Sequence, residues 1–190
     1  MRPVVFCFAL VVVAGAAAYG GSNVSAASGQ TAAARDAVSG QSSNVKTVPH
    51  ETLRGFLPEL PGWKRGEING ETSNEMGISI SRVQADYDKG EMTLSFEIMD
   101  SSLNQMLTSA FLMAAKTGVV EQTSVGYTKG TTVAGFPAVE SWTPAAKNGE
   151  LGLLVGGRYL VKVSGSTVPD VETIRKAVEA IDLKKLAALK

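Results

Sequence analysis

The chain has few of the residues on which disulfide-bonded proteins, metalloproteins and many hydrolases depend. Its 190 residues include one cysteine and one histidine, which excludes an intramolecular disulfide, a multi-cysteine zinc or iron–sulfur site and a multi-histidine metal centre. Lysine plus arginine number 18, as do aspartate plus glutamate, and this balance argues against a nucleic-acid partner. The glycine-rich motifs that bind nucleotide phosphates are absent as well. We therefore predict no cofactor and no metal.

Long apolar runs are confined to the N-terminus, at residues 4–18. An arginine precedes the run, and small residues at 24–26 suit a signal-peptidase cut. A retained membrane anchor is the alternative, but the run is short and rich in alanine and glycine. Residues 1–26 are therefore predicted to be a signal peptide that takes Cys7 with it. We expect an exported protein, periplasmic or extracellular, with no membrane span after cleavage.

The segment that follows, residues 27–49, is rich in alanine, serine, glycine, glutamine and threonine and contains no aromatic residue. Such a composition cannot bury enough apolar surface to offset the entropy of ordering the chain. We predict a flexible linker here and a single folded domain over residues 50–190.

Alternating apolar residues predict three strands in the first part of this domain, after a short helix at 50–56. The strands are expected at 63–69, 76–87 and 92–98. We predict a turn at Asn69-Gly70, and a bulge near Ser81-Arg82, where the apolar residues change phase. Helical spacing of leucine, methionine and phenylalanine then predicts a helix over 103–117.

The second part of the domain predicts about four more strands and a terminal helical region. The strands are expected at 124–129, 131–142, 150–155 and 158–164. A turn is predicted at Lys129-Gly130, and Pro137 indicates an edge strand or a bulge. Asp170 and Asp182 are expected to begin the last two helices. This order predicts an α+β fold, an α/β/α-sandwich-like antiparallel sheet of about six to seven strands packed by helices.

Two short motifs and the closing elements resemble the PsbP-like α/β/α-sandwich domains, which include bacterial secreted proteins. The motifs are Leu60-Pro61-Gly62-Trp63 at the domain start and the VAGFPA segment at 133–138. The hairpin at 151–163 and the helix that ends at Ile181-Asp182-Leu183 complete the resemblance. The resemblance implies a binding or assembly role without a shared catalytic set.

Few side chains could carry out chemistry. His50 is the only histidine that could serve as a base, and at the edge of the domain we expect it to be solvated. Asp86 and Asp88 would share one face of a strand and could bind a cation or act in acid–base chemistry, although a turn at 88–90 is favoured. Three further carboxylates lie in an expected loop, where solvation is favoured over a weak cation site: Glu67, Glu71 and Glu75.

Glu140 stands in an apolar strand, on the same face as Ala138 and Trp142. If that face points inward, the carboxylate needs a partner such as Arg158, and we predict a structural ion pair between the two. Four methionines recur every seven residues: Met92, Met99, Met106 and Met113. Because this period crosses a strand, a turn and a helix, core packing is predicted over a copper site.

Three functions are compatible with these features. The first, which we favour, is a non-catalytic binding or assembly module that acts through a surface patch, with Trp63 and Trp142 as candidate contacts to a protein or an apolar ligand. The second is a periplasmic carrier that holds an apolar ligand or lipid in a cavity between sheet and helix. The third is a hydrolase that uses only the carboxylates of Asp86, Asp88 and Glu140.

Overall fold

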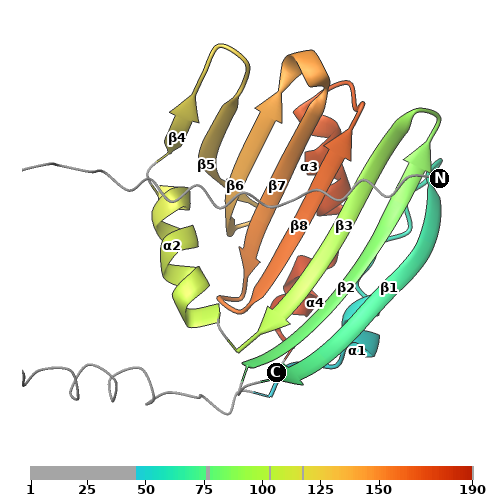
Figure 1. Ribbon diagram of the computed structural model, residues 1–190, viewed down its shortest axis with the longest axis vertical. Helices are drawn as coiled ribbons and strands as arrows, with labels where there is room; N and C mark the ends of the chain where they lie inside the picture. The colour runs from blue at the N-terminus through green and yellow to red at the C-terminus, as the bar shows by residue number, and fades with distance from the viewer. Residues whose placement is uncertain (1–45, 76–77, 103, 117, 190) are drawn as a thin grey trace, which may run out of the picture. The chain divides into compact units, whose positions relative to one another are not determined.

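One antiparallel sheet of eight strands, in the order β1-β2-β3-β8-β7-β6-β5-β4, organises the chain (Figure 1). The computed structural model describes residues 46–75, 78–102, 104–116 and 118–189. The strands are β1 (Lys64–Glu75), β2 (Ile78–Lys89), β3 (Met92–Ser101), β4 (Val119–Gln122), β5 (Tyr127–Val133), β6 (Phe136–Thr143), β7 (Asn148–Val155) and β8 (Tyr159–Ser166). The helices are α1 (His50–Arg54), α2 (Asn104–Lys116), the 3-10 turn η1 (Pro144–Ala146), α3 (Val171–Glu179) and α4 (Leu183–Ala187).

One face of the sheet is apolar, because alternate residues of the central strands point to the same side. These residues are fully or almost fully buried: Val83, Ala85, Tyr87, Leu94, Phe96, Ile98, Leu151, Leu153, Val155, Tyr159, Val161 and Val163. Three helices, α1, α3 and α4, pack on this face. Asp170 begins α3 by accepting a hydrogen bond from the Thr173 backbone N–H at 2.9 Å, so the predicted N-cap is correct.

The opposite face is polar over β1, β2, β3 and β8. Arg82 forms ion pairs there with Glu71 and Glu97, and Lys162 pairs with Glu97 at 2.9 Å. On this face α2 packs mainly on β5 and β6, at one end of the sheet (Figure 1). The alternation of apolar and charged residues along each strand therefore matches a sheet with one dry and one largely wet face.

The α+β class is confirmed, but the expectation of six to seven strands is wrong, because the short strand β4 was not predicted. In addition, two glycines lie inside strands where turns were predicted. Gly70 lies within β1, and a Cβ atom there would collide with the imidazole ring of His50. Gly130 lies within β5, where a Cβ atom would collide with the backbone carbonyls of Ala114 and Ala115 in α2. Both glycines permit a helix to approach the sheet closely, which is a second common use of glycine in strands.

The remaining differences concern register. β2 pairs without interruption with β3, so the bulge predicted near Ser81-Arg82 is wrong, and the register shift lies instead in β1, between Arg65 and Ile68. The apolar residues change phase because Ile78 and Ile80 lie, half-buried, on the other face. Pro137 is the second residue of β6, which lies between β5 and β7 and is not an edge strand. The chain turns just before it, at Ala134 and Gly135, where φ is positive.

The folded unit also begins before the predicted boundary at residue 50. Thr47 and Val48, which were assigned to the linker, are 7% and 6% exposed. The predicted signal peptide and most of the predicted linker lie outside the described residues, as do the two predicted ends of the helix at 103 and 117. Within the described ranges, every helix is too short or too polar to cross a membrane.

Substituting Gly130 tests the close approach of α2. We expect Gly130→Ala to lower the free energy of unfolding by about 1–3 kcal/mol, because the new methyl group must push α2 away from β5. The matched control is Gly152→Ala on β7, where a Cβ atom would make ordinary contacts with the Phe111 ring at 3.6 and 3.8 Å. Urea unfolding curves for both variants give the measurement. Equal stability of the two would contradict the packing described here.

Candidate functional site

Two of the three candidate hydrolase carboxylates, Asp86 and Asp88, share one face of a strand as predicted, but Glu140 does not join them. Asp86 and Asp88 lie on the wet face of β2, where they accept hydrogen bonds from Ser95 Oγ at 2.5 Å and from Thr93 Oγ1 at 2.9 Å. Glu140 faces the opposite, helix-covered side of the sheet. Of the residues that the structure describes, no three acidic, histidine or cysteine side chains are placed to hold a metal ion.

The structure also places the other predicted candidates, namely three glutamates and the methionines. Glu67, Glu71 and Glu75 lie on β1 and not in a loop, and Glu71 pairs with Arg82 at 2.7 Å. Met113 is 69% exposed, so core packing is wrong for this residue. The side chain of Met106 lies outside the described part of the structure.

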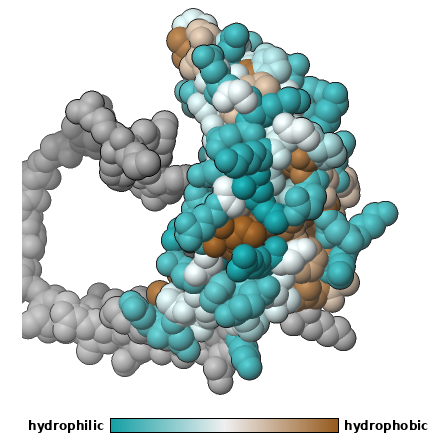
Figure 2. Space-filling model, turned by 90° about the vertical axis from the view of Figure 1, so that its right-hand side faces the viewer, coloured by the Kyte–Doolittle hydropathy of each residue, from teal (hydrophilic) through white to brown (hydrophobic). Residues whose placement is uncertain are grey.

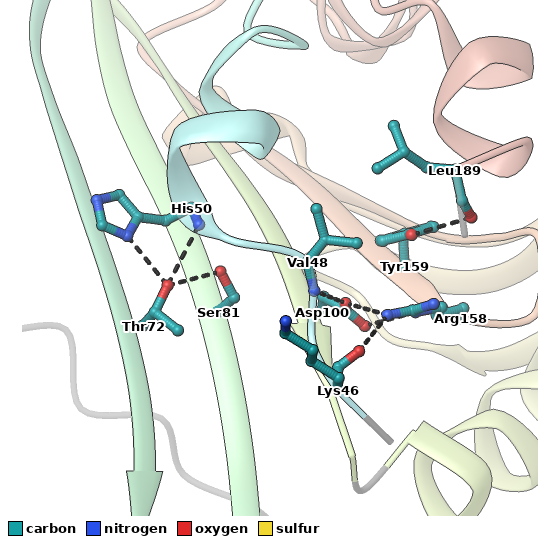
Figure 3. A network of polar contacts seen from close by, with 9 residues as sticks. All are labelled: Lys46, Val48, His50, Thr72, Ser81, Asp100, Arg158, Tyr159 and Leu189. Atoms are coloured by element: carbon teal, nitrogen blue, oxygen red, sulfur yellow. Dashed lines mark hydrogen bonds and ion pairs between the residues drawn. The ribbon is translucent and has the colours of Figure 1, made fainter. Parts of the chain in front are cut away.

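His50 is not simply solvated at the edge of the domain. Its Nδ1 lies 3.0 Å from Thr72 Oγ1, which also accepts a hydrogen bond from the His50 backbone N–H at 3.2 Å (Figure 3). Thr72 in turn contacts the buried Ser81, with the two hydroxyl oxygens 3.1 Å apart. Ser81 thus reaches the imidazole only through Thr72. The contacts attach α1 to β1 and β2.

A buried carboxylate fixes the point where the chain enters the fold. Asp100 is fully buried and accepts hydrogen bonds from Arg158 Nε at 3.0 Å and Nη2 at 2.7 Å (Figure 3). It also accepts from the Val48 backbone N–H at 2.7 Å, and Arg158 Nη2 donates to the Lys46 carbonyl at 3.0 Å. The hydrogen bond to Asp100 raises the pKa of Arg158 above its ordinary value. The next residue, Tyr159, donates to the Leu189 carbonyl at 3.2 Å, so both ends of the folded unit are held at the start of β8.

Glu140 is the second buried carboxylate, and three donors surround it. Tyr127 donates to Oε1 at 2.8 Å, and Lys129 Nζ lies 3.1 Å from the same oxygen. Arg175 of α3 contacts Oε2 through Nε at 2.6 Å and Nη2 at 2.5 Å. Burial by itself raises the pKa of Glu140, but the hydrogen bonds from Tyr127, Lys129 and Arg175 outweigh it and lower the pKa overall. Burial and the neighbouring carboxylate raise the pKa of Tyr127 to about 12.

The predicted ion pair between Glu140 and Arg158 is therefore replaced by two separate pairs. Arg158 lies in the turn between β7 and β8 and pairs with Asp100, whereas Glu140 pairs with Arg175 and Lys129. The sequence pattern did not identify Arg175 as a partner of Glu140. Its position directly after the buried Ile174 could have indicated that it lies at the border of the helix–sheet contact.

The two tryptophans lie on opposite sides of α3. Trp63 lines an open groove of about 290 Å³. The other lining residues are Leu60, Pro61, Leu94, Thr173, Lys176, Ala177 and Ala180. Trp142 pairs across strands with Tyr127, and its indole ring packs on Gly149. Ile174 of α3 rests on Gly149 and Gly165. Gly165 pairs across strands with Leu94, which lines the groove. The helix therefore lies between the groove and the Glu140 cluster.

The groove combines an apolar lining with positive charge. Lys176 of α3 borders it, and Lys89 Nζ lies 5.9 Å from the centre of the Trp63 ring. The side of the molecule that includes the β1 edge is mainly hydrophilic, with separate small hydrophobic areas, one of them at its centre (Figure 2). Comparisons of the chain with family models, with curated proteins and with solved structures gave no match. The function is therefore inferred from the side chains alone.

Replacing Glu140 should change how the free energy of unfolding depends on pH. The folded-state pKa of Glu140 is lowered, so its contribution is complete above the ordinary value of 4.5 and is lost as the pH falls through the folded-state value. We expect Glu140→Gln to lower the free energy of unfolding by about 2 kcal/mol at neutral pH, with a difference from wild type that shrinks in acid. Urea unfolding across a pH series measures this.

Glu150→Gln is the control, because the pKa of Glu150 is shifted in the opposite direction from that of Glu140. Burial raises the pKa of Glu150 and Glu97 adds to the shift, although Lys162 opposes it. A carboxylate with a raised pKa destabilises the fold as the pH rises through the folded-state value. This variant should therefore be no less stable than wild type at neutral pH. The two variants should differ from wild type in free energy of unfolding with opposite dependence on pH. If both differences follow the same course with pH, the opposite pKa shifts of Glu140 and Glu150 are wrong.

Asp100→Asn should release the N-terminal end of the folded unit. The substitution weakens the charge-assisted bonds with Arg158 and Val48, and we expect tryptic cleavage after Lys46 to accelerate about tenfold. Asp86→Asn, which changes an exposed aspartate, serves as the control. Mass spectrometry of the fragments gives the rates. Equal acceleration at Lys46 and at the exposed Lys147 would indicate global unfolding and contradict a local release.

Proposed function

We propose that the domain is an exported, non-catalytic binding module that holds one apolar side chain of a partner protein in the groove beside Trp63. The observation that supports this is a groove with apolar walls from two parts of the chain and cations at its border. Leu60, Pro61 and Trp63 contribute one side, and Ala177 and Ala180 of α3 contribute the other.

The size of the groove favours a side chain over a larger ligand. Pockets for small molecules enclose about 300–1,000 Å³ and bury most of the ligand, whereas this groove measures about 290 Å³ and is open to solvent. A single aromatic or branched side chain fills such a space, and anchors of this kind supply much of the energy of protein interfaces. Lys89 and Lys176 favour a partner segment in which an acidic group adjoins the anchor.

Two expectations from the sequence are consistent with this role and form part of the proposal. The predicted signal peptide favours an exported partner. The resemblance to PsbP-like α/β/α-sandwich domains implies binding or assembly, and helices pack on both faces of the sheet, with α1, α3 and α4 on one and α2 on the other.

A carrier of an apolar ligand would need an enclosed cavity between helix and sheet. Where α2 meets β5, the carbonyls of Ala114 and Ala115 leave no space even for a methyl group on Gly130. This contact favours the binding module. Native mass spectrometry of the protein purified from its host distinguishes the two, since a retained lipid would support the carrier and reject the module.

Site-specific photo-crosslinking in the native host tests the groove. A photoreactive amino acid at Thr173, in the groove, should yield one discrete adduct, and the same group at Gln84, on the wet face of β2, should not. Lys176→Glu should reduce the Thr173 adduct severalfold, because it reverses a charge at the border of the groove. The matched control is Lys184→Glu, a charge reversal at an exposed lysine of α4.

The partner found in the adduct must then supply the predicted chemistry. A synthetic peptide from its crosslinked segment, with an apolar residue next to a carboxylate, should quench Trp63 fluorescence in a Trp142→Phe background. No adduct at Thr173, an identical adduct at Gln84, or equal effects of the two charge reversals would each overturn the proposal.

A further inference from the structure

We propose that the cluster above Glu140 is a binding site for a small oxyanion, a phosphate or carboxylate group, on the side of α3 that faces away from the Trp63 groove. The site consists of Lys129 of β5 and Arg175 of α3, held side by side by the buried carboxylate, and it is flanked by the Tyr127–Trp142 pair. It does not depend on the function proposed for the groove.

The carboxylate at the base of the site has no remaining capacity to accept. Oε1 takes the hydrogen bonds of Tyr127 and Lys129, and Oε2 takes both contacts from Arg175. An ionised carboxylate offers about four acceptor positions, so all of them are used. Glu140 is fully buried and therefore presents nothing to a ligand, but serves as a support that fixes the two cations.

The cations keep donors that can face a ligand. A lysine and an arginine together carry more N–H groups than one carboxylate accepts, and the side chains of Lys129 and Arg175 are 36% and 29% exposed. Two positive charges meet one buried negative charge, so the accessible part of the cluster is cationic and rich in donors. Guanidinium groups bind oxyanions through paired hydrogen bonds, and a fixed orientation reduces the entropy lost on binding.

The neighbourhood favours an anion over a protein backbone or a cation. Lys129 Nζ also lies 5.0 Å from the centre of the Tyr127 ring, which holds the ammonium group at the edge of the strand. Within the described residues, the only other carboxylate within 4.0 Å of either cation is Glu172, whose Oε2 is 3.9 Å from Arg175 Nε. Glu172 is 58% exposed and can turn away into solvent when an anion binds.

Titration with inorganic phosphate and with acetate, at constant ionic strength, tests the proposal on the folded domain. We expect saturable shifts in the NMR signals of Lys129, Arg175 and Tyr127 at millimolar phosphate. Saturation by phosphate alone would assign a phosphate-bearing ligand, and saturation by both anions a ligand that carries a carboxylate. Absence of saturation with both anions would overturn the site.

Three variants separate this site from general attraction of anions. Lys129→Met should weaken binding about two- to fivefold, and Glu172→Gln, which removes the competing carboxylate and leaves the buried cluster intact, should strengthen it by a similar factor. Lys162→Met is the matched control, because Lys162 is a lysine of similar exposure (28%) paired with Glu97 on the opposite face. Equal weakening in Lys129→Met and Lys162→Met, or no gain in Glu172→Gln, would contradict the proposal.

Discussion

The contact between Ile174 and two glycines positions both the Trp63 groove and the cationic cluster. Gly149 and Gly165 are neighbours on β7 and β8, and a Cβ atom on either would come within 3.0 Å of the Ile174 side chain. Their lack of side chains lets α3 lie directly on the sheet. From that position the helix brings Arg175 to Glu140 and places Lys176 at the groove, which Leu94 also lines. The groove and the cationic cluster are thus the two sides of one helix–sheet contact.

The two buried carboxylates show how the same chemistry serves different purposes. Asp100 and Glu140 each pair with an arginine, and a buried charge requires such a partner. Around Asp100 the remaining bonds go to the backbone of residues 46 and 48, so the pair holds the chain end and is occupied by the protein itself. Around Glu140 the partners are long side chains that reach the surface, so this pair leaves cationic groups accessible.

The polar groups are divided between the two faces of the sheet. Asp86, Asp88 and Glu97 lie on the wet face, among hydroxyls and cations, whereas Glu140 and His50 lie on the helix-covered side. Glu140 therefore cannot act on the same bond as Asp86 or Asp88. The accessible features of the described surface include an aromatic groove and a cationic cluster.

The sequence by itself determined the α+β class, the alternating strand at 92–98 and the N-cap of α3, because these follow from local periodicity and side-chain chemistry. It left open which face of its strand Glu140 occupies. It could not distinguish a glycine in a turn from a glycine beneath a helix, so Gly70 and Gly130 were assigned to turns. It also did not reveal the short strand β4. Nor could it show that Arg175, 35 residues from Glu140, would reach it in place of Arg158. Only the tertiary structure decided these points, since each depends on which helix crosses which strand, and that is set by the packing of the whole apolar face.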